Sequence, residues 1–466
     1  MFEKSASETM KKQLFMQRKH ASSIMKDEAV KKADEFAVGY MEFMSKAKTE
    51  RLAVRDMITM AEQAGFTQFN PKSKYTSGDR IYVNNRGKAA IFAVIGSEHI
   101  EKGVLIAAAH IDSPRLDLKP APLYEDGELA MLKTHYYGGI KKYQWTALPL
   151  SLHGCIIRRD GSVLDVSIGD DPADPCFVIT DLLPHLAEEQ MKRTVREAVR
   201  GEDLNILVGS RPFKDDGGSE LVKLNILKLL FDKYNIVEED FLSAELQAVP
   251  AFGARDIGFD RSLIGAYGHD DRVCVYPAFM AALFAKHPKT TVVTVLADKE
   301  EVGSDGNTGM NSAFFENFIK DLAAMQQTVA RAVLHNSKCL SADVNAGFDP
   351  TYPDVLERRN AAFLNYGVVI TKYTGSRGKS DTSDASAEYM GLIRNTLSDA
   401  GVIWQHGQLG KVDTGGGGTV AKYIAKLDVD TVDLGVPVLS MHSPFEIVSK
   451  LDLYMAYLAF ESFFKL

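Results

Sequence analysis

Residues 104–112 read Val-Leu-Ile-Ala-Ala-Ala-His-Ile-Asp, an apolar run that ends directly in a histidine and an aspartate. A continuous apolar run of this length predicts a strand that is covered on both faces of a sheet. A second run, residues 291–297, is followed by the carboxylates Glu300 and Glu301. Because an open α/β sheet binds its ligands beyond the carboxyl ends of its strands, we expect these polar side chains to meet at one edge.

Five candidate metal ligands stand beside apolar runs of this kind: His110, Asp270, Glu301, Asp343 and His442. Two imidazoles and three carboxylates, with no thiolate, suit zinc, cobalt or manganese better than a structural cysteine site. Each position has an ordinary alternative when it is taken alone. His110 can be a structural histidine, the Glu300-Glu301 pair a solvated acidic turn, and Asp270 a helix cap. Their combination predicts a catalytic metal centre.

The spacing of the carboxylates indicates how their tasks are divided. Adjacent side chains in extended backbone point opposite ways, so one of Glu300 and Glu301 can bind metal while the other faces the substrate as general base. Asp112 lies two residues after His110, where it can accept the second N–H of a metal-bound imidazole. Asp270 can bridge two cations ~3.5–4 Å apart, one on each carboxylate oxygen.

The remaining pattern predicts an α/β fold, with a mixed sheet flanked by helices and an inserted β-rich second domain. Residues 22–64 repeat apolar side chains at helical spacing, whereas residues 119–250 hold short β-rich runs between Gly, Asp and Pro turns. We therefore assign residues 1–118 and 251–466 to one catalytic domain and residues 119–250 to the insertion. After the insertion we expect helices at 275–285, 313–332, 384–400 and 446–464, alternating with strands at 291–297, 364–371 and 438–441.

Composition excludes several classes of protein. The chain has 466 residues, 45% of them hydrophobic, and a formal net charge of −8, which gives no electrostatic footprint for nucleic acid or an anionic membrane. No apolar stretch approaches 20 residues, and the polar, lysine-rich N-terminus lacks the apolar core of a secretory signal. Four scattered cysteines without CxxC spacing favour reduced thiols. We expect a cytoplasmic protein.

Five motifs, in this order along the chain, resemble those of the aspartyl aminopeptidase family, a group of dinuclear zinc exopeptidases. They are His110-Ile111-Asp112-Ser113-Pro114, Gly268-His269-Asp270-Asp271-Arg272, Glu300-Glu301-Val302-Gly303-Ser304, Ser341-Ala342-Asp343 and Met441-His442-Ser443. The resemblance implies two metal ions, most simply zinc, with Asp270 between them. One ion would be bound by His110 and either Glu301 or Asp343, and the other by the remaining carboxylate and His442; the assignment that we favour pairs His110 with Asp343 and Glu301 with His442. The resemblance also implies that Glu300 is the general base and that Asp112 orients a histidine.

The same resemblance extends to the insertion and to assembly. Residues 119–250 match the family's second domain, which serves oligomerisation and substrate access. Within it, Leu183-Pro184-His185-Leu186-Ala187 resembles the motif whose histidine reaches a neighbouring subunit's active site, in a homo-oligomer expected to be a tetrahedral dodecamer. Lys372 stands where the family recognises an acidic side chain, although the following residues 373–384 depart from the expected form, so acidic specificity is open.

The expected reaction is release of one N-terminal amino acid from a peptide with a free N-terminus, through a metal-activated water. The alternative within the same chemistry is a dimetal amidohydrolase that acts on N-acyl amino acids or dipeptides. A binding or scaffold protein on an inactive metallopeptidase fold would require damage to the site. His110, Asp270, Glu300, Glu301, Asp343 and His442 are all competent residues, which opposes that possibility.

Overall fold

Strand β4 (Val104–His110) lies inside a nine-stranded sheet of the computed structural model, which describes residues 6–214 and 217–466. It pairs in parallel with β14 (Thr291–Ala297) on one side and with β15 (Lys338–Ser341) on the other. Every residue of β4 and β14 is buried, which confirms the predicted coverage of both faces. Three parallel strands therefore end at the same edge of the sheet.

The outer strands make this sheet mixed, as predicted. Its order is β1-β2-β3-β14-β4-β15-β19-β17-β18, and the β3–β14 and β19–β17 pairs are antiparallel. The bounds of the outer strands are β1 (Thr67–Gln68), β2 (Arg80–Asn85), β3 (Ala89–Val94), β17 (Val368–Thr371), β18 (Trp404–His406) and β19 (Asp430–Gly435).

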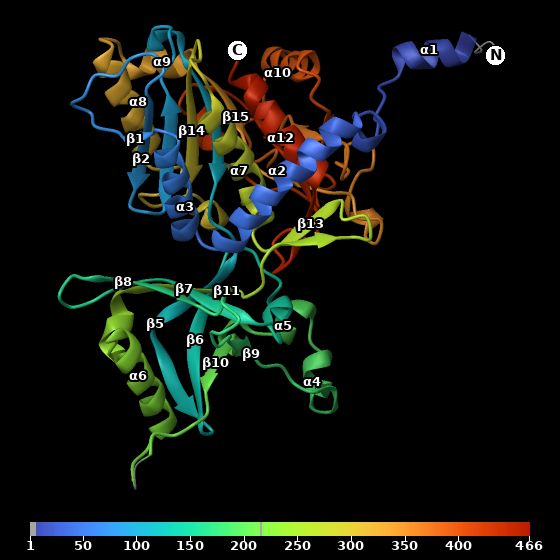
Figure 1. Ribbon diagram of the computed structural model, residues 1–466. Coiled ribbons are helices and arrows are strands. Elements are labelled where there is room, and N and C mark those ends of the chain that lie inside the picture. The colour runs from blue at the N-terminus through green and yellow to red at the C-terminus, as the bar shows by residue number, and fades with distance from the viewer. Residues whose placement is uncertain (1–5, 215–216) are drawn as a thin grey trace.

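Helices cover both faces of the nine-stranded sheet (Figure 1). One core is built with α2 (Asp27–Lys46), α3 (Glu50–Gln63), α7 (His269–Phe284), α10 (Ala387–Asp399) and α12 (Lys450–Phe463). The opposite core is built with α8 (Phe314–Met325), α9 (Ala330–His335) and α11 (Ala421–Ala425). The short helix α1 (Ala6–Leu14) extends away from the rest of the chain in Figure 1. The helical spacing of residues 22–64 is confirmed by α2 and α3, which occupy most of that range.

A second, seven-stranded sheet lies below the first in Figure 1 and is antiparallel throughout. Its order is β8-β7-β11-β5-β6-β10-β9. Its strands are β5 (Arg115–Asp126), β6 (Leu129–Tyr137), β7 (Leu150–Ile157), β8 (Val163–Ile168), β9 (Val178–Ile179), β10 (Asn205–Gly209) and β11 (Ala244–Pro250). Helix α6 (Leu221–Tyr234) packs on it, and α4 (Glu188–Met191) and α5 (Val195–Ala198) precede β10. The division at residues 118/119 and 250/251, with separate functions for the two parts, stays a prediction.

Several predicted elements differ in their bounds. The helix expected at 446–464 is wrong at its start, because Glu446–Ser449 forms β21 in a three-stranded sheet with β12 (Arg255–Ile257) and β13 (Leu263–Ala266). Helix α12 begins only at Lys450, where the Ser449 hydroxyl accepts hydrogen bonds from two backbone N–H groups and caps it. The helix expected at 313–332 is two helices, α8 and α9.

The other differences are smaller. Helix α7 begins six residues before the expected position 275, at His269. The strand expected at 438–441 is shorter, because β20 (Pro437–Val438) pairs only with β16 (Asn345–Ala346). All four cysteines are free of disulfides. Among residues 6–214 and 217–466, no helix has the length and apolar character needed to cross a membrane.

Candidate metal centre

Six predicted side chains meet at the carboxyl ends of the parallel strands, four of them at or just after the ends of β4, β14 or β15. His110 is the last residue of β4, Glu300 and Glu301 begin a 3-10 turn after β14, and Asp343 follows β15. Asp270 lies at the start of α7, and His442 follows β20. Ligand atoms lie within 4.8 Å of one another in three groups: His110 with Asp270 and Asp343, His110 with Glu300 and Glu301, and Asp270 with Glu301 and His442.

Asp270 occupies the middle of this arrangement. Its Oδ1 lies 3.2 Å from His110 Nε2, and its Oδ2 lies 3.1 Å from His442 Nε2. On the His442 side, Glu301 Oε1 is 3.5 Å from Nε2. On the His110 side, Asp343 Oδ1 is 4.0 Å from Nε2. The distances form two half-sites that share Asp270, which is the grouping of side chains that a dinuclear site requires.

Hydrogen bonds set the protonation of both imidazoles. His110 Nδ1 lies 3.1 Å from the backbone oxygen of Asp112, and His442 Nδ1 lies 2.9 Å from the backbone oxygen of Gly139. Because a carbonyl oxygen only accepts, each Nδ1 carries a proton and donates it. In the neutral imidazole each Nε2 then presents a lone pair toward Asp270, which is the form that binds a metal.

The buried carboxylates create a strong demand for positive charge. Burial, together with the charge of Asp270, raises the pKa of Glu301 well above its usual value. Burial and the neighbouring Asp271 do the same to the pKa of Asp343. Burial opposes a charge on His442, yet its contact with Asp270 and the charge of Glu301 raise its pKa to about 10. The site therefore favours cations, whether protons or metal ions.

An unpaired oxygen shows that the side chains fit a metal. Glu301 Oε1 is buried and has no hydrogen-bond partner among the described residues. Such an oxygen costs roughly 1–3 kcal/mol when it is left unsatisfied. A divalent cation held by Glu301, Asp270 and His442 would supply that partner. The nitrogen and oxygen donors also match the ligands that zinc takes in catalytic sites.

Asp112 lies beside the candidate ligands and holds three groups of the site in position by direct contact. It is fully buried, and its Oδ1 lies 3.4 Å from His110 Nδ1. The same carboxylate accepts hydrogen bonds from the backbone N–H groups of Glu300 at 3.1 Å and Glu301 at 3.2 Å. One carboxylate thus orients a candidate ligand and the turn that presents both glutamates.

Sequence reasoning missed three supporting groups. Glu446 is buried and accepts hydrogen bonds from the backbone N–H of Asp270 at 2.9 Å and of His442 at 2.6 Å. The Tyr137 hydroxyl donates to Asp112 Oδ2 at 2.8 Å, and Gly139 supplies the carbonyl for His442. The contacts of Glu446 with Asp270, of Tyr137 with Asp112 and of Gly139 with His442 join segments that are distant in the chain, so no local pattern marks them.

Besides Asp112, two predicted functional residues, His185 and Lys372, lie outside the three groups of metal-ligand atoms in the described part of the chain. His185 is exposed in the 3-10 turn Pro184–Leu186, which follows the seven-stranded sheet's β9. Lys372 follows β17, is partly exposed, and its Nζ lies 2.7 Å from Asp384 Oδ1. The roles of both residues stay predictions. Glycines 415 and 416 help to line a cavity of about 550 Å³ that also contacts His442.

Known proteins have sequences and folds similar to those of this chain. The sequence model of the aminopeptidase I zinc metalloprotease family (M18) matches residues 43–464. A probable M18 family aminopeptidase 1 from Clostridium acetobutylicum is 51% identical over 429 residues, 90% of this chain and 92% of the relative. The crystal structure of an M18 aminopeptidase from Thermotoga maritima superposes with a TM-score of 0.93 at 45% identity, over 97% of this chain and 100% of that one.

A more distant structure shares the fold alone. It is the S. cerevisiae mApe1 dodecamer, with a TM-score of 0.74 at 21% identity over 93% of this chain and 96% of that one. The family match covers nearly the whole chain and includes every residue of the metal centre. The chain belongs to the M18 family of aminopeptidase I zinc metalloproteases.

Proposed function

We propose that this M18 aminopeptidase releases single N-terminal amino acids from peptides, with two metal ions in the centre and Glu300 as general base. The observation that carries the proposal is the shared position of Asp270, which offers one oxygen to each of two half-sites. His110 and Asp343 would hold one ion, and Glu301 and His442 the other. Bound zinc would supply Lewis acidity and make water acidic enough to act as a nucleophile near neutral pH.

The two adjacent glutamates differ in a way that suits separate tasks. The Glu301 side chain is 3% exposed, as a ligand would be, whereas that of Glu300 is 18% exposed. The backbone of Glu300 is held by Asp112, so its carboxylate is presented from a fixed turn. Glu300 would take a proton from the attacking water and return it to the leaving amine, a step worth roughly 10²–10⁴-fold in rate.

A free N-terminus would be required because the α-amino group of the substrate would bind one metal ion or a nearby carboxylate. An acylated nitrogen offers neither a free lone pair nor a charge for that contact. The cavity of about 550 Å³ beside His442 would accommodate the peptide, and Tyr143, Tyr352 and Leu356 line it. The substrate would therefore enter with its charged end toward the metal centre.

A paired assay tests the proposal against the related amidohydrolase. Purified protein is given a peptide with a free amino group and the same peptide after N-acetylation, beside a panel of aminoacyl-p-nitroanilides. We expect cleavage of the free-amine peptide one residue at a time and no cleavage of the acetylated form. Faster cleavage of the acetylated peptide would assign the chain to the amidohydrolase reaction. The panel also reports whether acidic or neutral N-terminal residues are preferred.

Assembly and location complete the proposal. We include a homo-oligomer, the tetrahedral dodecamer being the expected form, because a structural neighbour is described as a dodecamer. Exposed apolar side chains near His185 support an interface there, namely Leu182, Leu183, Leu186 and Met191. In that assembly His185 would act in the neighbouring subunit's site, and Lys372 would contact an acidic substrate side chain after release from Asp384. A cytoplasmic location and the absence of nucleic-acid partners stay predictions.

A further inference from the structure

The end of strand β6 leaves the seven-stranded sheet and passes along the metal centre. Its last residue, Tyr137, is followed by Gly138 and Gly139. The Tyr137 hydroxyl donates to Asp112 Oδ2 at 2.8 Å. The other contacts of Asp112, described above, are with His110 and the backbone of the two glutamates. Tyr137 thus adds a directed hydrogen bond to the carboxylate that orients His110 and the turn of the two glutamates.

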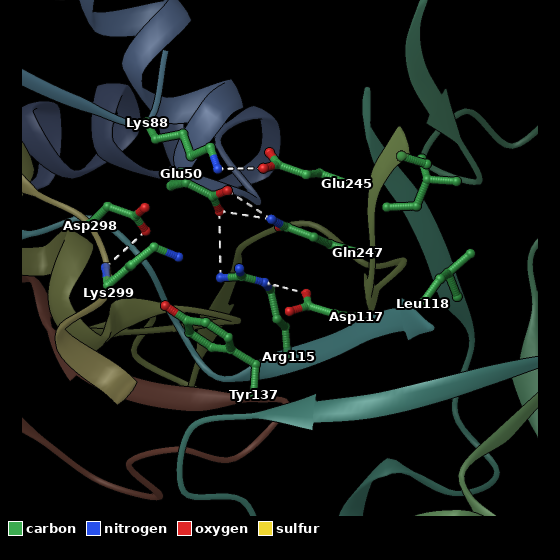
Figure 2. A pocket seen from close by; sticks show the side chains of 12 residues that line it. Glu50, Lys88, Arg115, Asp117, Leu118, Tyr137, Glu245, Gln247, Asp298 and Lys299 are labelled. Carbon is green, nitrogen blue, oxygen red and sulfur yellow. Dashed lines mark hydrogen bonds and ion pairs between the residues drawn. The ribbon is translucent and has the colours of Figure 1, made fainter. Parts of the chain in front are cut away.

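Arg115 fixes the ring of Tyr137. Its guanidinium carbon lies 3.8 Å from the centre of that ring, a distance typical of a cation stacked on an aromatic face. Figure 2 shows Arg115 between Tyr137 and Glu50, with its Nη1 3.5 Å from Glu50 Oε2 and its Nε donating to Asp117 at 2.8 Å. Gln247 in turn donates to both oxygens of Glu50. The Tyr137 ring is therefore supported by a connected polar network.

Gly138 touches the second half-site. Its φ is +75°, and a Cβ built there would lie 3.2 Å from Glu301 Oε2 and 3.3 Å from Glu301 Cβ. Pro114 Cβ is equally close at 3.3 Å, so a side chain at this position would require Glu301 or Pro114 to shift by a few tenths of an ångström. The glycine lets the backbone pass close to a candidate metal ligand.

Gly139 reaches the remaining candidate ligand of that half-site. Its carbonyl oxygen accepts the proton of His442 Nδ1 at 2.9 Å. This contact selects the imidazole form whose Nε2 faces Asp270 and Glu301. His442 and Gly139 are 303 residues apart in the chain, so only the tertiary packing of their two segments creates the pair.

We propose that residues 137–139 are a positioning segment of the metal centre, supplied by the seven-stranded sheet. The inference rests on the metal centre proposed above. Tyr137 orients Asp112, Gly138 leaves room for Glu301, and Gly139 holds His442 in its metal-binding form. None of the three touches the reacting atoms; they act through the ligands. Partners of this kind contribute about 10–100-fold to metal affinity or activity.

The test measures zinc affinity directly. Full-length protein is stripped of metal and titrated with Zn²⁺ in competition with a chromophoric chelator. Tyr137→Phe removes only the hydroxyl and keeps the ring on Arg115. The matched control is Tyr389→Phe in helix α10. It removes a buried hydroxyl that donates a hydrogen bond to the backbone oxygen of Cys339 at 2.9 Å. We expect zinc to dissociate 10–100-fold more readily from Tyr137→Phe, with Tyr389→Phe unchanged.

A second pair of variants tests Gly138. Gly138→Ala adds a methyl group against Glu301, whereas Gly161→Ala adds one at φ +81° with no atom within 4 Å. The two variants introduce similar backbone strain. A lower zinc affinity in Gly138→Ala than in Gly161→Ala would therefore report the contact of the added methyl group beside Glu301. If Gly138→Ala fails to fold, Tyr137→Phe decides. For Tyr137→Phe we also expect kcat to fall with KM nearly unchanged and with normal thermal unfolding of the metal-free protein.

The outcomes separate the two proposals. If the wild type binds no zinc tightly, the proposed metal centre fails. If the wild type and Tyr389→Phe bind zinc tightly and Tyr137→Phe binds it equally well with the same kcat, the centre stands and the positioning segment is refuted.

Discussion

Replacing Glu300 by Gln tests the division of work between the two adjacent glutamates. The amide keeps the size of the side chain and leaves the backbone hydrogen bond to Asp112 intact, because that bond is donated by the Glu300 N–H. It removes the group that accepts a proton. A general base contributes roughly 10²–10⁴-fold, so the activation free energy is expected to rise by about 2.7–5.4 kcal/mol.

The assay combines turnover with metal content. We expect kcat on an aminoacyl-p-nitroanilide to fall by about 10²–10⁴-fold in Glu300→Gln, with zinc content and thermal unfolding close to wild type. Glu301→Gln is the control, because the buried Oε1 of Glu301 has no hydrogen-bond partner among the described residues and is the proposed metal ligand, and this variant should lose zinc. A Glu300→Gln enzyme near full rate would remove Glu300 from the role of base. Loss of zinc in Glu300→Gln alone would exchange the two assignments.

Three further predictions concern stability and specificity. The Lys48 side chain is 3% exposed and its Nζ lies 2.6 Å from the carboxylate of Asp170, which Asp170→Asn removes. The free energy of unfolding in urea should fall by about 1–3 kcal/mol, and this loss is smaller than for a fully buried ion pair because Asp170 is 31% exposed. Burial opposes the charge of Asp170, but its contacts with His153 and Lys48 lower its pKa to about 2. The charged carboxylate therefore stabilises the folded state fully above pH ~4, and this stabilisation is lost as the pH falls toward 2. Thermal unfolding in acid should show that loss in the wild type but not in Asp170→Asn. Ser449→Ala removes the cap of α12 and should cost about 1 kcal/mol, read as a lower Tm, and an unchanged Tm would contradict the capping role. Lys372→Ala should reduce kcat/KM for acidic relative to neutral N-terminal residues by about tenfold, which is the effect of losing one ion pair worth ~1.4 kcal/mol. An unchanged ratio would show that Lys372 does not recognise the substrate and only pairs with Asp384.

The sheet at the site could be predicted because its strands are continuously apolar. Burial on both faces removes the alternation that exposed strands show, and β4 and β14 carry that signature directly before polar residues. The parallel pairing of these strands then places Ala297 opposite His110, which is why side chains far apart in sequence meet. His110, Glu300 and Glu301 could be predicted for the same reason, whereas Asp270 and His442 lie outside this sheet and are expected from their motifs.

Strand β5 escaped prediction because its pattern is irregular. The middle of β5 is partly exposed, contains Pro120 and Pro122, and shifts register between Leu118 and Leu123. Such an interruption hides the period of two on which strand prediction depends. The contacts of Tyr137 with Asp112, of Gly139 with His442 and of Glu446 with Asp270 could not be predicted either, since each depends on how separate segments pack rather than on local sequence.

The most direct test of the central claim counts metal ions. Zinc per chain is measured by elemental mass spectrometry on the active protein and on Asp270→Asn. We predict two zinc ions per chain in the active protein and fewer than two, with loss of activity, when the shared carboxylate is neutralised. Full activity with one ion or none, or an Asp270→Asn protein that retains both ions and its rate, would contradict a dinuclear centre built around Asp270.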